Sequence, residues 1–210
     1  MEKFKTLKAI AAPLPRDNVN TDIIFPGKYL STVARSGFGA MAFETIRYRQ
    51  DGSPNPDCIF RQSPFDGAGI LLTGHNFGCG SSREHAVWAI RDLGFRCIIA
   101  KSFGDTFYHN CLANGLLALT LETEAVDRLI AGAKDGEIVV DLENQRVQGP
   151  DSEVYRFEID EFQKDCLLRG LDAIALTLQD EDRIAAFEQR QQAEQPWLYA
   201  LSSRAPASDQ

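Results

Sequence analysis

The chain has 210 residues, of which 44% are hydrophobic and 25% are charged. This composition predicts one globular domain that builds its core without disulfide or metal staples. Apolar runs as short as Ile70–Leu72 exclude a membrane span, so we expect no membrane partner, and the first residues show no signal peptide. The net charge of −8 argues against nucleic acid as a partner.

The cysteines indicate a reducing compartment, and we therefore expect a cytoplasmic protein. Their number is odd, and no two follow the CxxC spacing of a zinc site. An iron–sulfur cluster needs about three or four clustered thiolates, which this spacing does not offer. We expect buried or unreactive thiols at all five positions: Cys58, Cys79, Cys97, Cys111 and Cys166.

The first third of the chain predicts short elements separated by turns. A strand is expected over residues 7–11, and a polar turn rich in Asn and Asp follows over residues 16–22. Ile23–Phe25 has the pattern of a short strand that ends at Pro26. Residues 31–39 read as a loop, and residues 41–48 can form a short helix.

The clearest unit lies in the middle of the chain. Residues 70–73 predict an apolar strand, residues 74–80 a glycine-rich turn, residues 81–93 a helix that ends at Gly94, and residues 97–100 a second strand. A strand, helix and strand in this order predict a parallel pair joined by a right-handed crossover, and hence an α/β fold.

The remaining sequence predicts further elements of the same fold. Helices are expected over residues 103–113, 124–131, 160–169 and 180–192, and strands over residues 116–119, 138–140 and 154–157. We see no repeat and no dividing linker, so we expect one domain over residues 1–195. Residues 196–210 read as a tail, disordered from about Ser202 onward.

Residues 78–85, GCGSSREH, carry the richest chemistry, and two interpretations of them compete. In the structural one, Ser81 and Glu84 have the S-x-x-E spacing of a capping box and only begin the helix. In the functional one, the free N–H groups of the first helical turn attract an anion, and Arg83 grips a carboxylate. Ser81 would then lie beside the reacting atom, where its alkoxide form is stabilised.

The sequence does not match several other known catalytic or nucleotide-binding motifs. The G-x-S-x-G elbow and the dinucleotide fingerprint each lack a glycine, and neither a Walker loop nor HExxH occurs. The three histidines are scattered along the sequence, which predicts no metal site. Cys79 with His85 stays open as a thiol–imidazole pair, although a packed thiol and a helix-surface histidine explain them more simply.

Taken together, these residues resemble a known family. The segment GCGSSREHA with the nearby WAI is similar to the swivelling domain of the aconitase superfamily, and the chain more closely resembles the small subunits of bacterial two-subunit 3-isopropylmalate dehydratases. Further matches occur in family order from about residue 4 to residue 192: DNVNTD (17–22), PGKYLSTVARSGFG (26–39), PNPD (54–57), NFGCG (76–80), KSF (101–103) and GLDAIALTL (170–178).

The resemblance implies a fold and a reaction. The fold is α/β, a swivelling β/β/α domain with C-terminal helices. The activity is that of a hydro-lyase in leucine biosynthesis, which interconverts 2-isopropylmalate and 3-isopropylmalate through isopropylmaleate. The family uses a [4Fe–4S] cluster bound by the large subunit and not by this chain. The implied partners are therefore the large subunit and a small dicarboxylate substrate.

The resemblance also implies roles for single residues. Ser81 matches the catalytic serine, which removes the proton alpha to a carboxylate, and Asp22 matches an acidic active-site residue. Arg83, with its neighbour Ser82, matches the residues that bind a substrate carboxylate, and Arg35 matches a substrate arginine after a one-residue shift. The substrate loop, about residues 29–35, offers apolar contact to an isopropyl group from its side chains: Leu30, Thr32 and Val33.

Three alternatives stay open from the sequence. The same fold could serve a related hydro-lyase acting on citraconate/2-methylmalate, homoaconitate or dimethylmalate. The chain could be a stand-alone carboxylate-binding module without a partner subunit. A hydrolase that depends on Cys79 is the third possibility.

Overall fold

The computed structural model describes residues 1–31 and 37–199. Contacts divide the chain into two compact units, Met1–Asp172 and a second that begins at Ala173. Each is described by itself, and the single domain expected over residues 1–195 stays a prediction. Among the residues in these two ranges, no helix has the length and apolar character that a bilayer crossing needs.

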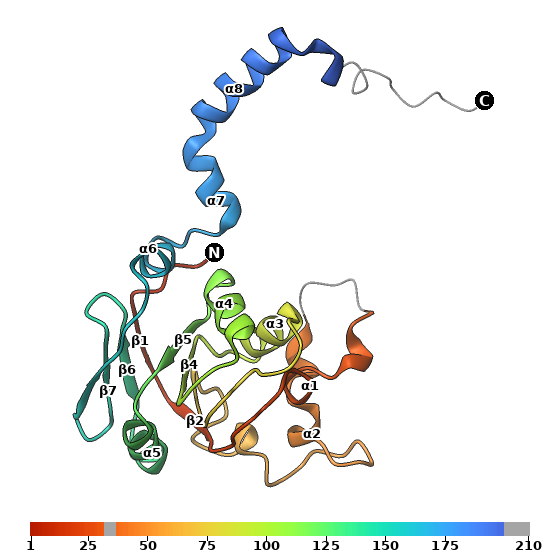
Figure 1. The fold of residues 1–210 in the computed structure, drawn as a ribbon. Coiled ribbons are helices and arrows are strands. Elements are labelled where there is room, and N and C mark those ends of the chain that lie inside the picture. Colours follow the sequence, from red (N-terminus) through yellow and green to blue (C-terminus); the bar gives the residue numbers. More distant parts are fainter. Residues whose placement is uncertain (32–36, 200–210) are drawn as a thin grey trace. The chain divides into compact units, whose positions relative to one another are not determined.

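A parallel sheet forms the centre of the first unit, with the strand order β2-β3-β4-β5 (Figure 1). Its strands are β2 (Ala11–Leu14), β3 (Ile70–Thr73), β4 (Cys97–Ala100) and β5 (Leu117–Thr120). The crossover helices α3 (Glu84–Asp92) and α4 (Asp105–Ala113) lie together on one side, and α5 (Thr123–Ala131) packs on β3. The parallel pair predicted around residues 70–100 is confirmed.

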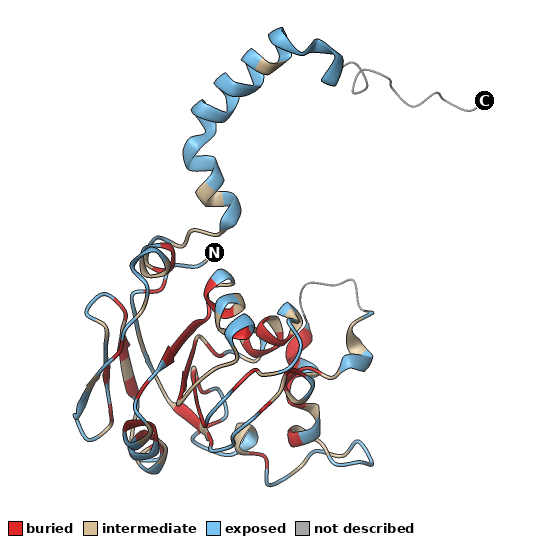
Figure 2. Cartoon of the chain, viewed as in Figure 1, coloured by how far each residue is buried: buried red, intermediate tan, exposed pale blue. Residues whose placement is uncertain are grey.

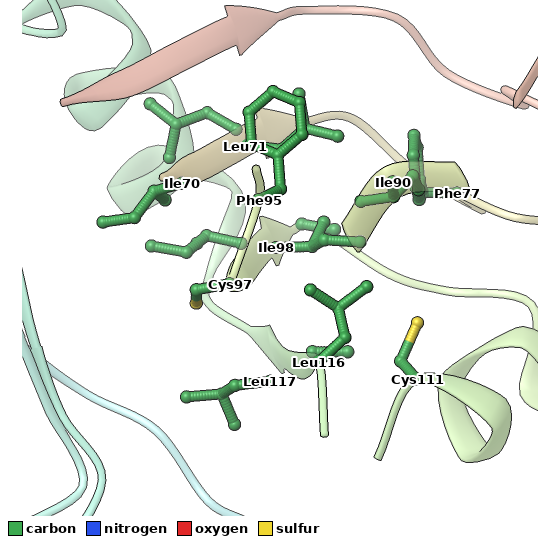
Figure 3. Close-up of a cluster of buried hydrophobic side chains, with 14 of the residues drawn as sticks. Ile70, Leu71, Phe77, Ile90, Phe95, Cys97, Ile98, Cys111, Leu116 and Leu117 are labelled. Atoms are coloured by element: carbon green, nitrogen blue, oxygen red, sulfur yellow. The ribbon is translucent and has the colours of Figure 1, made fainter. Parts of the chain in front are cut away.

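The centre of this sheet is buried on both faces, as the continuous apolar runs of its strands predict. Every residue of β3 and β4 is buried, and Leu71 lies opposite Ile98 in the register of the pair. Figure 3 shows these side chains packing with Phe77, Ile90 and Leu116 in one cluster. Each fully buried Leu or Ile contributes about 1.5–3 kcal/mol to the free energy of folding.

A second, antiparallel sheet has the order β1-β6-β7-β8. Its strands are β1 (Thr6–Ala9), β6 (Ile138–Asp141), β7 (Arg146–Gln148) and β8 (Val154–Arg156), and α6 (Glu161–Arg169) follows them. The two sheets with their layer of helices confirm the predicted α/β class of swivelling β/β/α type. The single strand expected over residues 7–11 is wrong in one respect, because the chain changes sheets at Ile10.

Two other sequence-based expectations are also wrong. Ile23–Phe25 is not a strand, since α1 (Thr21–Ile24) begins here with Asn20 as its cap; the Asn20 side chain accepts a hydrogen bond from the Ile23 nitrogen at 2.9 Å. The helix expected over residues 81–93 begins at Glu84 instead. The short α2 (Glu44–Arg47) lies inside the predicted helix over residues 41–48.

The second unit is helical. It contains α7 (Ala173–Thr177), a 3₁₀ turn over Leu178–Asp180, α8 (Glu181–Glu194) and a final 3₁₀ turn over Pro196–Leu198. The predicted helix over residues 180–192 matches α8, whereas α7 was not expected. The tail predicted to be disordered from Ser202 lies outside the described residues.

Candidate active site

The candidate residues gather beyond the carboxyl ends of the parallel strands. Residues 15–22 follow β2, residues 74–83 follow β3, and residues 101–104 follow β4. Parallel register brings these three loops to one edge of the sheet, where α/β proteins usually bind ligands. The topology thus brings Asp22 together with the loop that carries Ser81 and Arg83.

Backbone hydrogen bonds clamp the loop after β3 onto the loop after β2. The Gly78 nitrogen donates to the Val19 oxygen at 2.7 Å, and the Thr21 nitrogen donates to the Cys79 oxygen at 3.0 Å. The Ser81 nitrogen donates to Oγ1 of Thr21 at 3.2 Å. Thr21 is 1% exposed, so a buried hydroxyl fixes the backbone of the candidate base.

Gly78 is required by both conformation and space. Its φ is +74°, in the left-handed region that favours glycine, and a Cβ at this position would lie 2.1 Å from the Phe107 ring. Phe107 is buried on α4. The turn that presents Ser81 is therefore shaped by the helix that follows β4.

A pair of asparagines supports the same turn, and the sequence analysis missed them. Asn18 and Asn76 have φ values of 53° and 55°, and Nδ2 of Asn76 donates to Oδ1 of Asn18 at 2.8 Å. The Asn76 nitrogen also donates to Oγ of Ser102 at 2.8 Å. The available signal was the tolerance of Asn for left-handed backbone, which marks both positions as turns.

The capping-box interpretation of Ser81 and Glu84 is wrong. Helix α3 begins at Glu84, with Arg83 as the N-cap residue and no side-chain cap. The Glu84 carboxylate instead accepts a hydrogen bond from Nδ2 of Asn114 at 3.2 Å. Ser81 and Ser82 lie in the exposed loop before the helix, and the Ser82 carbonyl accepts from Nδ2 of Asn110 at 3.4 Å.

Arg83 and Asp22 form an ion pair beside this loop. Nη1 of Arg83 donates to Oδ1 of Asp22 at 2.6 Å. The Arg83 side chain is 23% exposed and the Asp22 side chain 58% exposed, so the pair is partly open to solvent. Gly27 borders the pair closely, because a Cβ there would lie 3.3 Å from Oδ1 of Asp22. A guanidinium has five N–H donors, which leaves donors for a second carboxylate.

The predicted substrate loop is described in part. Thr32, Val33 and Arg35 lie outside the described residues, and Leu30 is half-buried at the end of a 3₁₀ turn over Gly27–Tyr29. The Glu44 carboxylate holds that turn.

Two side chains of the turn donate to Oε1 of Glu44, the ammonium of Lys28 and the hydroxyl of Tyr29, each at 2.9 Å. The hydrogen bond from Lys28, with that from Tyr29, lowers the pKa of Glu44 despite partial desolvation.

The aromatic contacts of His85 give this residue a structural role that needs no thiol partner. Its ring centroid lies 5.8 Å from Phe25 in a stacked arrangement, 5.7 Å from Phe38 and 4.9 Å from Trp88. Aromatic pairs at these distances contribute about 0.5–1.5 kcal/mol each beyond their buried area. His85 therefore joins α3 to the segment around Phe25 and Phe38.

The five cysteines of this chain differ in their exposure to solvent. Cys79 is partly exposed, and the other four are buried. Burial raises the pKa of both Cys97 and Cys111, which keeps them as neutral thiols rather than thiolate ligands. Within residues 1–31 and 37–199, no group of three or more His, Cys, Asp or Glu side chains could hold a metal ion.

Comparison with known proteins decides the family. Residues 1–124 match the family described as the Aconitase C-terminal domain, residues 127–161 match one described as LeuD_N, and residues 174–200 match the C-terminal domain of the 3-isopropylmalate dehydratase small subunit. The 3-isopropylmalate dehydratase small subunit of Paramagnetospirillum magneticum is 51% identical over 94% of this chain and 100% of its own length. That of Xanthobacter autotrophicus is 50% identical over the same shares. The chain belongs to the family of 3-isopropylmalate dehydratase small subunits.

A solved structure of this family has a similar fold. The crystal structure of 3-isopropylmalate dehydratase from Methanocaldococcus jannaschii has a TM-score of 0.64 and 26% identity, and the match covers 87% of this chain and 99% of that one. Asp22, Ser81 and Arg83 lie in the part that matches the Aconitase C-terminal domain, and residues 174–200 of the second unit match the C-terminal domain of the small subunit.

Proposed function

We propose that this chain is the small subunit of a 3-isopropylmalate dehydratase and that its sheet edge is half of the active site. The observation that carries the proposal is the Asp22–Arg83 ion pair beside the exposed Ser81, in a chain 51% identical over its relative's full length. The reaction interconverts 2-isopropylmalate and 3-isopropylmalate through isopropylmaleate, in leucine biosynthesis. The unpaired cysteines support a cytoplasmic location.

Arg83 is the proposed clamp for a substrate carboxylate. Asp22 engages Nη1, which fixes the plane of the guanidinium and leaves its remaining donors for the ligand. A planar fork that is oriented in advance loses less entropy when it binds than a free side chain would. The exposed hydroxyl of Ser82 lies next to it in sequence and adds a donor at the same loop.

Ser81 is the proposed base. Its alkoxide oxygen takes the proton from the carbon alpha to the carboxylate, the C–O bond at the neighbouring carbon breaks to release hydroxide, and the double bond of isopropylmaleate forms while Ser81 holds the proton. Return of the proton and hydroxide to the exchanged carbons gives the isomer. The bond from Ser81 to Thr21 fixes the backbone that aims this oxygen.

We propose that the large subunit binds the [4Fe–4S] cluster of the enzyme, as the family resemblance implies; residues 1–31 and 37–199 of this chain contain no group of three or more His, Cys, Asp or Glu that could hold a metal ion. Such a cluster with an open iron supplies Lewis-acid chemistry toward a hydroxyl and a carboxylate when bound. Leu30, Thr32 and Val33 are proposed to contact the isopropyl group, and Arg35 a carboxylate. Discrimination by such apolar contacts is worth about 1–3 kcal/mol per methylene.

The test is reconstitution of the two-subunit enzyme. The chain is co-purified with its large subunit, loaded with iron and sulfide, and assayed for hydration of isopropylmaleate and of citraconate. We expect preference for isopropylmaleate and at least about a hundredfold loss of kcat in Ser81→Ala with assembly intact. Ser53→Ala is the control, because Ser53 is only half-buried and its hydroxyl donates to Asp51 within its own loop. Near-normal turnover of Ser81→Ala contradicts the base, and preference for citraconate contradicts the substrate.

A further inference from the structure

Most of the large hydrophobic side chains that are exposed among the described residues lie in the second unit. Eight large hydrophobic side chains are exposed among the described residues, and six of them lie between residues 173 and 199: Ile174, Leu178, Ile184, Phe187, Trp197 and Leu198. Neither α7 nor α8 contains a buried residue, as Figure 2 shows. Large apolar side chains that gather on an exposed surface commonly mark an interaction site.

Two apolar side chains of α8 line a surface hollow. Ile184 and Phe187 line it together with Thr177, and its volume is about 450 Å³. Asp180 and Arg183 stand at the same hollow as an ion pair of 2.9 Å. An apolar stripe at spacings of three and four residues with charged neighbours is how helices dock into grooves.

The end of the unit presents two further anchors in a fixed turn. The Tyr199 hydroxyl donates to Oε1 of Gln191 at 2.7 Å, which ties the last 3₁₀ turn back to α8. Trp197 is 65% exposed and Leu198 is 55% exposed on that turn. An ordered turn that holds a tryptophan in solvent fits an interface, where tryptophan is among the commonest hot-spot residues.

A helix of this length also needs a partner for its own stability. Isolated helices shorter than about 12–15 residues are marginal in water, and most helical stability in proteins comes from packing of the apolar face. Helix α8 has 14 residues and, as described, none of them is buried.

We propose that residues 173–199 are a docking element that binds the large subunit of the same enzyme, in an apolar groove bordered by lysine and arginine side chains. This inference rests on the proposed function, because it takes its partner from it.

The charge of residues 173–199 favours the large subunit as the partner over a second copy of this chain. Residues 173–199 carry five carboxylates and two guanidiniums: Asp180, Glu181, Asp182, Glu188, Glu194, Arg183 and Arg190. Two such elements side by side would repel each other, and the chain as a whole has a net charge of −8. A basic rim complements the segment and suppresses pairing between copies.

The family matches also favour the large subunit as the partner of residues 173–199. The aconitase-type match is named for a C-terminal domain, a piece of a longer chain, yet here it occupies residues 1–124 of a separate subunit. A covalent link supplies a high effective concentration between domains, and a separate subunit needs extra contact to replace it. The match over residues 174–200 is to a domain named for the small subunit.

The test measures association of the full-length chain with the large subunit by sedimentation or calorimetry. We expect the double variant Ile184→Ser/Phe187→Ser to weaken binding at least about thirtyfold, and Trp197→Ser about tenfold. Phe162→Ser is the matched control, because Phe162 is 57% exposed on α6, and we expect less than about a threefold change. With the large subunit in excess of the weakened Kd, turnover of the variants returns to that of the unchanged chain.

Three results would overturn the docking element. These are unchanged affinity of the double variant, self-association of the chain that the double variant abolishes, and equal hydrogen-exchange protection of α8 in the isolated chain and in the complex. A complex that forms normally, responds to the variants and yet fails to turn over isopropylmaleate contradicts the proposed function and leaves the docking element standing.

Discussion

The side-chain oxygen of Thr21 accepts a hydrogen bond from the backbone nitrogen of Ser81 at 3.2 Å, although the two residues lie 60 positions apart. Thr21 is buried, and its own nitrogen donates to the Cys79 carbonyl. One threonine therefore satisfies two groups of the loop that presents the proposed base. Its hydroxyl positions Ser81 and is not expected to touch substrate.

Replacing that hydroxyl should misplace Ser81. Thr21→Val keeps the shape and leaves the Ser81 N–H without its acceptor, so we expect kcat to fall about ten- to a hundredfold while KM changes little. Thr21→Ser retains the oxygen and should recover most of the rate. Steady-state kinetics of the reconstituted enzyme measures both, and equal rates for Val and Ser would contradict the positioning role.

Loss of the guanidinium fork should weaken substrate binding. Arg83→Lys keeps the charge without the planar fork, and we expect KM to rise at least about tenfold, more in Arg83→Gln. Arg169→Gln is the control, since Arg169 forms an exposed ion pair with Asp165 at 3.0 Å. A double-mutant cycle with Asp22→Asn should show coupling of about 0.5–3 kcal/mol. Additive effects would mean that Asp22 does not orient Arg83.

Thiol labelling should separate Cys79 from the buried cysteines. Burial raises the pKa of Cys97 and of Cys111, so their thiols stay protonated at about pH 8 and unreactive. We expect an alkylating reagent followed by peptide mass analysis to modify Cys79 first and the other two after unfolding. Cys79→Ala should retain turnover in the complex, whereas its loss there would favour a thiol-dependent reaction.

The Glu44 cluster predicts a pH dependence of stability. The pKa of Glu44 is lowered in the folded chain by hydrogen bonds from Lys28 and Tyr29, so the unfolded chain binds its proton more tightly. Its contribution is complete above the unfolded value of about 4.3 and is lost as the pH falls through the lower folded value. Urea unfolding should show Glu44→Gln slightly less stable than the unchanged chain at about pH 7 and equal to it at about pH 2.5. A constant difference across this range would contradict the prediction.

The elements with strong local signals could be predicted from the sequence. Strands 70–73 and 97–100 have the expected bounds, because apolar runs between glycine-rich turns admit little else. The start of α3 could not be placed, since the Ser81–Glu84 spacing of a capping box is satisfied by other partners, Thr21 and Asn114, from distant parts of the chain. The change of sheet at Ile10 depends likewise on partners more than 50 residues away.

The sequence suggests which residues form the candidate site, but it does not predict how these residues come together. The motif around Ser81 and Arg83 predicts a site for a carboxylate, the resemblance adds Asp22, and these roles stay predictions. Their approach follows from the parallel register of β2 and β3, which no local pattern states. Thr21, Asn18 and Asn76 support the site through hydrogen bonds that link two loops, and single-sequence periodicity carries no trace of such pairs.

The exposure of Ser81 on the described chain has a consequence for how the enzyme is switched on. The hydroxyl of a water-exposed serine is too weakly acidic to supply an alkoxide base unless cations or N–H donors lie close to its oxygen. In the proposed role, we expect the large subunit to cover this loop, exclude water and strengthen the attraction between the alkoxide and the positive groups of the assembled site. We therefore expect the unassembled chain to show no dehydratase activity.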